Sequence, residues 1–248
     1  MNILEQIQTA AKELGLPVPA TAFDTADLTA IQLSGLWNAL GQEQYEFYRW
    51  RELQATYVFD TVVNQESYEL PADFSGMISN TVWSRTNHWS LIGAMTPQQW
   101  ETLKSGIVAL GPRRRYRLNG NAIEIFPTPT LEGTGASTDL ETLAFEYYRS
   151  GWVVHPTGDT VEVRNDAISN DDTTFFPDRL MISGLKLKMW QIKGFDTRTL
   201  QADYERILGT VTSRNQAAPI LSLSPRLSPI FIGLGNISDG NWNVGGSP

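Results

Sequence analysis

The spacing of apolar residues changes twice along the 248-residue chain, and this limits the possible folds more than any other feature. Residues 3–14 and 28–50 carry apolar side chains at intervals of three and four, as on one face of a helix. Residues 56–168 instead hold β-branched and aromatic runs between turn residues, which is typical of strands. Helical spacing returns over residues 180–208. We therefore expect an α+β protein in which helices from both ends form one bundle, with an inserted β-rich domain of sandwich or barrel type.

Capping residues set the expected ends of the helices. Gly15 ends the first helix, and Asp24 or Thr25 caps a second one that we expect to run through Trp50. Further helix starts are predicted at Thr96-Pro97, Pro177-Asp178 and Asp196.

Two β-hairpins are expected between the helices. Asn119-Gly120 predicts a hairpin turn because both residues tolerate a positive φ. Residues 56–70 predict another, with its turn at Asn64-Gln65. The resulting division is N-terminal helices at 1–55, a β-rich insert at 56–170, C-terminal helices at 171–215 and an extended tail at 216–248.

The tail has a composition of its own, with fourteen Gly, Pro or Ser residues and only one Arg and one Asp. Such a segment cannot form a core by itself. Its apolar side chains would then be exposed, so we expect them to contact a partner surface. The residues expected to make this contact are Pro219, Ile220, Leu221, Leu223, Pro225, Arg226, Leu227, Ile230 and Phe231.

The formal net charge is −8, from 19 Lys plus Arg and 27 Asp plus Glu. This argues against a surface that grips nucleic-acid phosphates, since such binding needs clustered cations. The chain has no cysteine, and no spacing typical of a metal site, a phosphate-binding loop or a dinucleotide fingerprint. We therefore expect neither a metal nor a cofactor. No apolar run approaches the ~20 residues of a membrane span, so we expect no membrane segment.

Catalytic readings have little support in the sequence. The two histidines, His88 and His155, are not accompanied by a nucleophile elbow, which argues against a serine triad. The carboxylate pairs considered for hydrolysis are Glu66 with Glu69 and Glu141 with Glu146. Acids at such strand and turn positions are more often solvated than catalytic. We therefore expect no catalytic residue.

The stretch WSRTNHWS, residues 83–90, concentrates unusual side chains. Trp83 and Trp89 flank five polar residues, which predicts a hairpin loop closed by an aromatic cross-strand pair. Aromatic faces beside Asn and Arg also occur in sugar-binding sites. We favour the hairpin, with Trp83, Arg85, His88 and Trp89 as candidate contacts to a neighbouring subunit or a tail component.

Residues 113–117, RRRYR, form the only basic cluster of the sequence. Alternation along a strand would send the odd-numbered arginines to one face and Arg114 with Tyr116 to the other. The arginines can contact a phosphate backbone or pair with acids on neighbouring strands or subunits. The negative net charge favours pairing, and we name Arg113 and Arg115 as candidate contacts.

The order of these elements resembles the head-to-tail adaptor proteins of short-tailed bacteriophages. The resemblance covers nearly the whole chain. It rests on the break GLPVP, the helix end FYRWREL, the entry YELPADF into the β insert, the returning helix FPDRLMISGLKLKMWQIKGFD and the apolar APILSLSPRLSP.

This resemblance implies a structural virion protein of the head–tail neck, assembled in the host cytoplasm and without enzymatic activity. It implies a homo-oligomeric ring, usually of twelve subunits, that is fixed beneath the portal protein and receives the tail nozzle protein. The bore would conduct double-stranded DNA without sequence-specific binding, which fits the negative charge because an acidic wall repels phosphate. In such adaptors the C-terminal segment extends along the portal, so the apolar tail is assigned to portal binding.

Two other functions stay open from the residues alone. A tail-associated carbohydrate-binding or cell-wall-degrading module would use the aromatic-rich β domain and acids such as Glu66 or Glu141. A nucleic-acid-binding protein would rest on residues 113–117 and show steeply salt-dependent affinity for DNA.

Overall fold

The computed structural model describes residues 1–106, 113–130, 140–157 and 160–215. These form two compact units. The first, which we call the helical unit, comprises residues 1–57, 71–78 and the described residues from 146 onward. The second, the β unit, comprises residues 58–70 and the described residues between 79 and 145. Helices and antiparallel sheets are both present, which confirms the predicted α+β class.

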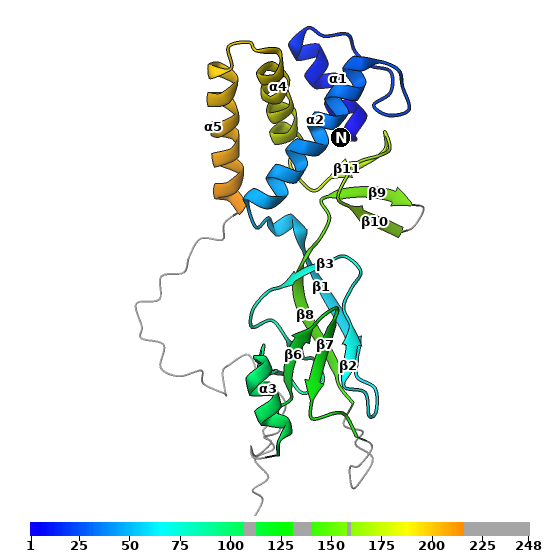
Figure 1. Ribbon diagram of the computed structural model, residues 1–248, viewed down its shortest axis with the longest axis vertical. Helices are drawn as coiled ribbons and strands as arrows, with labels where there is room; N and C mark the ends of the chain where they lie inside the picture. The colour runs from blue at the N-terminus through cyan, green and yellow to red at the C-terminus, as the bar shows by residue number, and fades with distance from the viewer. Residues whose placement is uncertain (107–112, 131–139, 158–159, 216–248) are drawn as a thin grey trace, which may run out of the picture. The chain divides into compact units, whose positions relative to one another are not determined.

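Four helices form a bundle in the helical unit (Figure 1). They are α1 (Ile3–Leu14), α2 (Leu28–Phe47), α4 (Asp178–Lys193) and α5 (Arg198–Asn215). Helix α4 packs against the other three. Because α1 and α2 precede the strands of the β unit and α4 and α5 follow them, helices from both ends of the chain form one bundle, as predicted.

Helix α2 is shorter than the sequence suggested. It begins after Asp27, whose carboxylate accepts a hydrogen bond from Thr29 N at 2.9 Å, so the predicted cap at Asp24 or Thr25 was wrong. It ends at Phe47 and does not reach Trp50. The reason is that Trp50 turns into the core, where its indole N–H donates to the Gln44 carbonyl at 2.7 Å. A short 3-10 helix, η1 (Arg51–Leu53), follows.

The core of the helical unit is built around Trp152, which is completely buried. Its ring lies 5.0 Å from that of Trp37 and 5.8 Å from that of Phe176, measured between centroids. The ring also covers Gly41 of α2. A β-carbon at position 41 would come within 1.9 Å of the indole, so only glycine fits beneath it.

Replacing Gly41 with Ala should lower the free energy of unfolding by about 2–4 kcal/mol, because the added methyl group displaces a buried tryptophan. Gly35, on the same helix, provides the matched control, since a β-carbon there meets no atom within 4 Å. Gly35→Ala should raise stability by up to about 1 kcal/mol through helix propensity. Urea unfolding followed by circular dichroism measures both, and equal effects at the two positions would contradict the packing described.

Strands β9 (Val153–Thr157), β10 (Thr160–Arg164) and β11 (Thr173–Thr174) form a small antiparallel sheet of the helical unit, in the order β10-β9-β11. The chain enters this sheet directly from the buried Trp152. A short strand, β3 (Phe74–Met77), pairs with residues Tyr147–Arg149.

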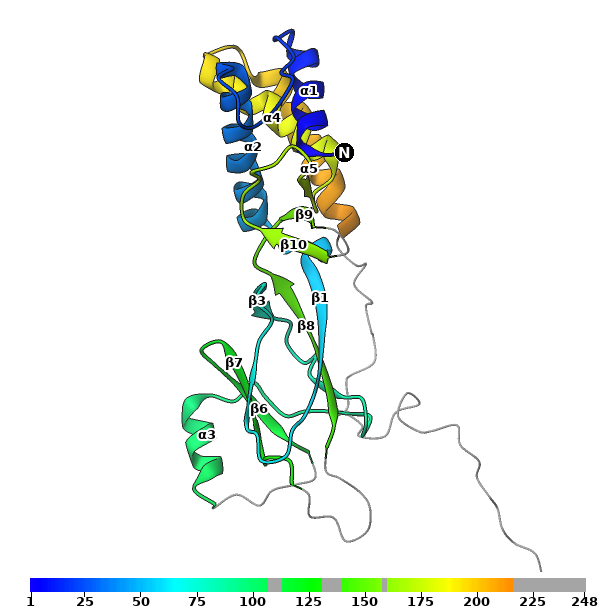
Figure 2. The ribbon, with the colours of Figure 1, turned by 90° about the vertical axis from the view of Figure 1, so that its right-hand side faces the viewer.

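The β unit contains strands of two sheets and one short helix. Strands β1 (Gln54–Asp60) and β8 (Thr142–Arg149), each divided between the units, are followed in one sheet by β4 (Trp83–Ser84) and β5 (Trp89–Ser90). The other sheet has the order β2-β7-β6, with β2 (Ser67–Glu69), β6 (Arg115–Asn119) and β7 (Ala122–Phe126). Helix α3 (Pro97–Lys104) lies beside β6 and β7 (Figure 2).

The turns and helix starts predicted from the sequence of the β unit were partly confirmed. The hairpin at Asn119-Gly120 is confirmed, with Gly120 at φ +59°, and Thr96 caps α3 as predicted. The predicted hairpin over residues 56–70 was wrong, because β1 and β2 belong to different sheets. Strand β2 pairs with β7 instead, where it buries Tyr68 against Ile123.

Candidate interaction surfaces

The stretch 83–90 forms the expected hairpin, but not the expected aromatic pair. Trp83 lies opposite Ser90, and Ser84 lies opposite Trp89. Neighbouring strand positions point to opposite faces, so the two tryptophans are on different faces of the hairpin. Trp83 is exposed, as are Arg85 and His88 in the loop. These side chains remain candidate contacts of the β unit.

The basic cluster at residues 113–117 is largely used within the β unit. Arg117 donates to Glu124 on β7 at 2.6 Å, and its guanidinium lies 4.9 Å from the centre of the Trp100 ring. Burial by itself would raise the pKa of Glu124, but hydrogen bonds from Asn119 and Arg117 hold it below its ordinary value. The interpretation as ion pairs between neighbouring strands is therefore confirmed for Arg117. Arg113 and Arg115 are half-buried at the start of β6.

Arg114 is the most buried member of the cluster. Its Nε donates to Glu141 at 3.0 Å, and each side chain of this ion pair is only 3% exposed. The Arg114 guanidinium also donates to the Pro127 carbonyl. The backbone of Glu141 exchanges two hydrogen bonds with Thr61, at 2.7 and 2.9 Å. The pair therefore joins the starts of β6 and β8 with the end of β1.

The carboxylate pairs considered for hydrolysis do not face each other across a cleft. Glu141 is buried, whereas Glu146 is exposed and lies five residues further along an extended segment, about 16 Å away. Glu66 forms an ion pair with Lys104, and Glu69 is three strand positions away on the other face. This geometry does not support acid–base chemistry by either pair.

The apolar residues expected to contact a partner, Pro219 to Phe231, lie outside the described residues. The chain reaches them through Asn215, the last residue of α5. Its carboxamide accepts from Arg51 N at 2.9 Å and donates to Glu52 at 2.5 Å. These two bonds fasten the end of α5 to η1.

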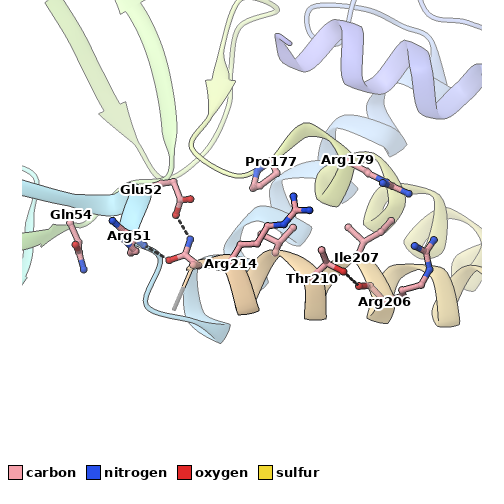
Figure 3. A pocket seen from close by; sticks show the side chains of 11 residues that line it. Arg51, Glu52, Gln54, Pro177, Arg179, Arg206, Ile207, Thr210 and Arg214 are labelled. Carbon is pink, nitrogen blue, oxygen red and sulfur yellow. Dashed lines mark hydrogen bonds between the residues drawn. The ribbon is translucent and has the colours of Figure 1, made fainter. Parts of the chain in front are cut away.

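A groove of about 790 Å³ lies beside this point in the helical unit. We call it the arginine groove, because exposed arginines from η1, α4 and α5 line it: Arg51, Arg179, Arg206 and Arg214. Figure 3 shows the last three along one side of α5. Its apolar lining comes from Pro177, Ile207 and Val211. Glu52 is the only acid among the lining residues that the structure describes.

Most of the positive charge of the arginine groove is not neutralised within the molecule. Arg206 donates to Asp203 at 3.1 Å, but both side chains are exposed, so this pair contributes little. Arg51, Arg179 and Arg214 form no ion pair within residues 1–106, 113–130, 140–157 and 160–215. The groove therefore presents at least three available guanidinium groups over an apolar floor, which suits a ligand that carries both carboxylates and an apolar group.

An exposed acidic loop lies elsewhere in the helical unit. Residues 165–171, which we call the acidic loop, connect β10 to β11. Ile168 is 62% exposed, and the exposed Asp166 and Asp171 flank it. Neither aspartate forms an ion pair within the part of the chain that the structure describes. The loop therefore combines an apolar tip with two available carboxylates.

The acidic loop is held firmly at its base. The backbone of the buried Ala167 exchanges two hydrogen bonds with the Asn38 carboxamide, at 2.9 and 3.1 Å. The fully buried Asp172 accepts from Ile168 N and Ser169 N, each at 2.8 Å, and from His155 at 2.5 Å. His155 therefore supports a loop in this fold.

Sequence reasoning missed both surfaces. The four arginines of the groove come from three segments far apart in the chain. One local signal was available, since Arg206, Thr210 and Arg214 recur at every fourth position and therefore share a face of α5. For the loop, the signal was an isoleucine among acids between two strands.

Membrane-spanning helices and metal-binding clusters are both absent from the described residues. None of their helices is long and apolar enough to cross a membrane. They also contain no group of three or more His, Asp or Glu side chains placed to hold a metal ion.

Comparisons with known proteins point to one family. A family described as SU10 adaptor protein matches residues 1–225, about nine tenths of the chain. No curated protein gave a significant match.

Proposed function

The chain belongs to the SU10 adaptor protein family, and from this we propose that it is the ring-forming adaptor between the head and the tail of a short-tailed bacteriophage. The family membership confirms the resemblance to adaptor proteins that the sequence suggested. It also implies a structural role. The match to residues 1–225, which includes both ends of the helical bundle and the whole β unit, carries the proposal.

In this proposal the protein is part of the virion neck, assembled in the host cytoplasm. About twelve copies form a ring beneath the portal protein, and the opposite face of the ring receives the tail nozzle protein. Double-stranded DNA passes through the bore without sequence-specific binding. The net charge of −8 supports this role, because an acidic wall repels phosphates.

The portal contact is assigned to the tail, from Pro219 to Phe231, in keeping with its apolar composition. The exposed side chains of Trp83, Arg85 and His88, together with Trp89, Arg113 and Arg115, are proposed as contacts of the β unit with a neighbouring subunit or a tail component.

Mixing the full-length chain with the portal protein of the same phage should yield a portal with an additional ring, visible by negative-stain electron microscopy. The chain alone should sediment as a monomer or weakly associated species, because the portal provides the template. An antibody against a terminal tag should then label the neck of intact virions. Labelling of the tail fibres or of the head shell would contradict the proposed position.

A further inference from the structure

We propose that the acidic loop of one copy docks into the arginine groove of a neighbouring copy, and that this contact joins the helical units around the ring. The inference rests on the proposed function, since it supplies a subunit contact for the ring. Each surface is defined within the helical unit alone.

Charge complementarity is the first argument for this occupant. The groove offers the available guanidinium groups of Arg51, Arg179 and Arg214, and the loop offers the available carboxylates of Asp166 and Asp171. Arginine and carboxylate form bidentate hydrogen bonds, which fix orientation as well as charge. Copies of a chain of net charge −8 repel one another, and a cluster of cations that faces a neighbour's acids offsets this repulsion.

The apolar parts of the two surfaces also match. Ile168 lies between the two aspartates in the sequence and is 62% exposed. The groove has an apolar lining from Pro177, Ile207 and Val211, so the isoleucine side chain can be buried there while the flanking carboxylates reach the arginines. Three such side chains fit easily within about 790 Å³.

The loop is ordered before it binds. Asn38 and Asp172 hold its backbone through four hydrogen bonds, and His155 holds the Asp172 carboxylate through a fifth. Little conformational entropy is therefore lost on docking. A rigid loop with exposed side chains is the expected form of the inserted half of an interface.

The placement of the two surfaces favours a ring. The groove is formed by η1, α4 and α5, whereas the base of the loop is bonded to Asn38 of α2 and, through Asn170, to Ala22. In Figure 1, α5 lies at the left of the helical unit and the adjoining β9–β10 hairpin at its lower right, with the lower end of α2 between them. Two different, complementary patches on separate elements of a unit give a heterologous contact, which generates a ring when the rotation between copies closes.

A disulfide trap tests the contact, and the absence of native cysteine makes it specific. Two full-length variants, Ile168→Cys and Thr210→Cys, are mixed in equal amounts with the portal protein of the same phage, which is the template for the ring, and oxidised gently. Disulfides between copies of this chain are counted. Thr210 lines the groove and is exposed. Random collision makes the mixed disulfide about half of the product, whereas docking should make it nearly all. In 1 M NaCl, where the Debye length is about 3 Å, the excess should fall.

Gly209→Cys provides the matched control for the groove variant. This exposed position adjoins Thr210 on α5, a β-carbon there meets no atom within 4 Å, and it points about 100° away. When Gly209→Cys is mixed with Ile168→Cys, the mixed disulfide should make up only about half of the product, as random collision gives. An excess as large as that of Thr210→Cys would contradict the proposed docking.

Charge reversal gives a second test, since all four positions are exposed. The loop reversal is Asp166→Lys/Asp171→Lys, and the groove reversal is Arg179→Glu/Arg214→Glu. When both cysteine variants carry the same reversal, the excess of mixed disulfide over the random half should disappear. Combining a loop-reversed copy with a groove-reversed copy should restore it. If the mixed disulfide stays at about half of the product in all of these mixtures, the inference is overturned. The groove would then be assigned to another protein if it binds a labelled oligo-aspartate peptide and loses this binding in Arg179→Glu/Arg214→Glu. Portal co-assembly that persists alongside a random share would leave the proposed function intact.

Discussion

Deleting residues 219–248 should abolish co-assembly with the portal while leaving both units folded. The deleted segment carries the apolar residues proposed to dock, and its Gly, Pro and Ser content leaves it without a core of its own. The described core contains none of its residues, and the bonds that Asn215 makes to Arg51 and Glu52 remain. Circular dichroism should therefore be nearly unchanged, while the truncated chain no longer sediments with the portal.

Full-length variants separate the loss of docking residues from the loss of chain length. Replacing Ile220, Leu221 and Leu223 with Ser should remove co-assembly as the deletion does, because the apolar contact is lost. Replacing the interspersed Ser222 and Ser224 with Ala should retain it. Portal binding by the truncated chain would contradict the assignment of the tail.

Replacing Glu141 with Gln should lower the stability of the β unit by about 3–5 kcal/mol, because Arg114 is then left as a buried charge without its partner. Loss of any function in this variant would reflect unfolding and would not identify Glu141 as a catalytic acid. Hydrogen exchange of the β6 and β8 amides, followed by mass spectrometry, localises the effect to this unit.

Two controls make this prediction specific. Glu101→Gln removes an exposed carboxylate 4.0 Å from Arg117 and should change stability by less than about 0.5 kcal/mol. Arg114→Met combined with Glu141→Leu removes both buried charges and should recover a large part of the loss. A Glu141→Gln variant as stable as Glu101→Gln would show that the pair does not stabilise the unit.

The elements that sequence predicted well are those determined by adjacent residues. Gly15 adopts the left-handed conformation that ends α1, and Thr96 closes a capping box with Gln99 at the start of α3. The Asn119-Gly120 turn fixes the register of β6 and β7. Each signal acts over three or four positions, so no distant part of the chain has to be known.

Strand pairing was predicted less well, because the choice of partner is not local. Strand β1 alternates in burial as its sequence indicates, yet it lies beside β8, which follows more than 80 residues later. The same limit applies to the hairpin at 83–90, where a two-residue strand pair sets Trp83 against Ser90. Alternation reveals which face a residue occupies, but not what lies opposite.

The arginine groove illustrates the limit for sites. Arg51 and Arg179 are 128 positions apart, and only the packing of η1 and α4 with α5 brings them to one surface. By contrast, the tail is proposed as a contact site from composition alone, because a lack of core-forming capacity is a property of the segment itself.

The fastening of α5 by Asn215 also has a mechanical consequence. Its carboxamide bridges Arg51 N and Glu52 directly before the chain continues toward the tail. A load applied along the tail must therefore break two hydrogen bonds to a neighbouring segment before it can unwind the last turn of α5. In the proposed assembly Asn215 is a tether point, which would pass tension from the docked tail to residues 51 and 52 and keep the helix from unravelling from its end.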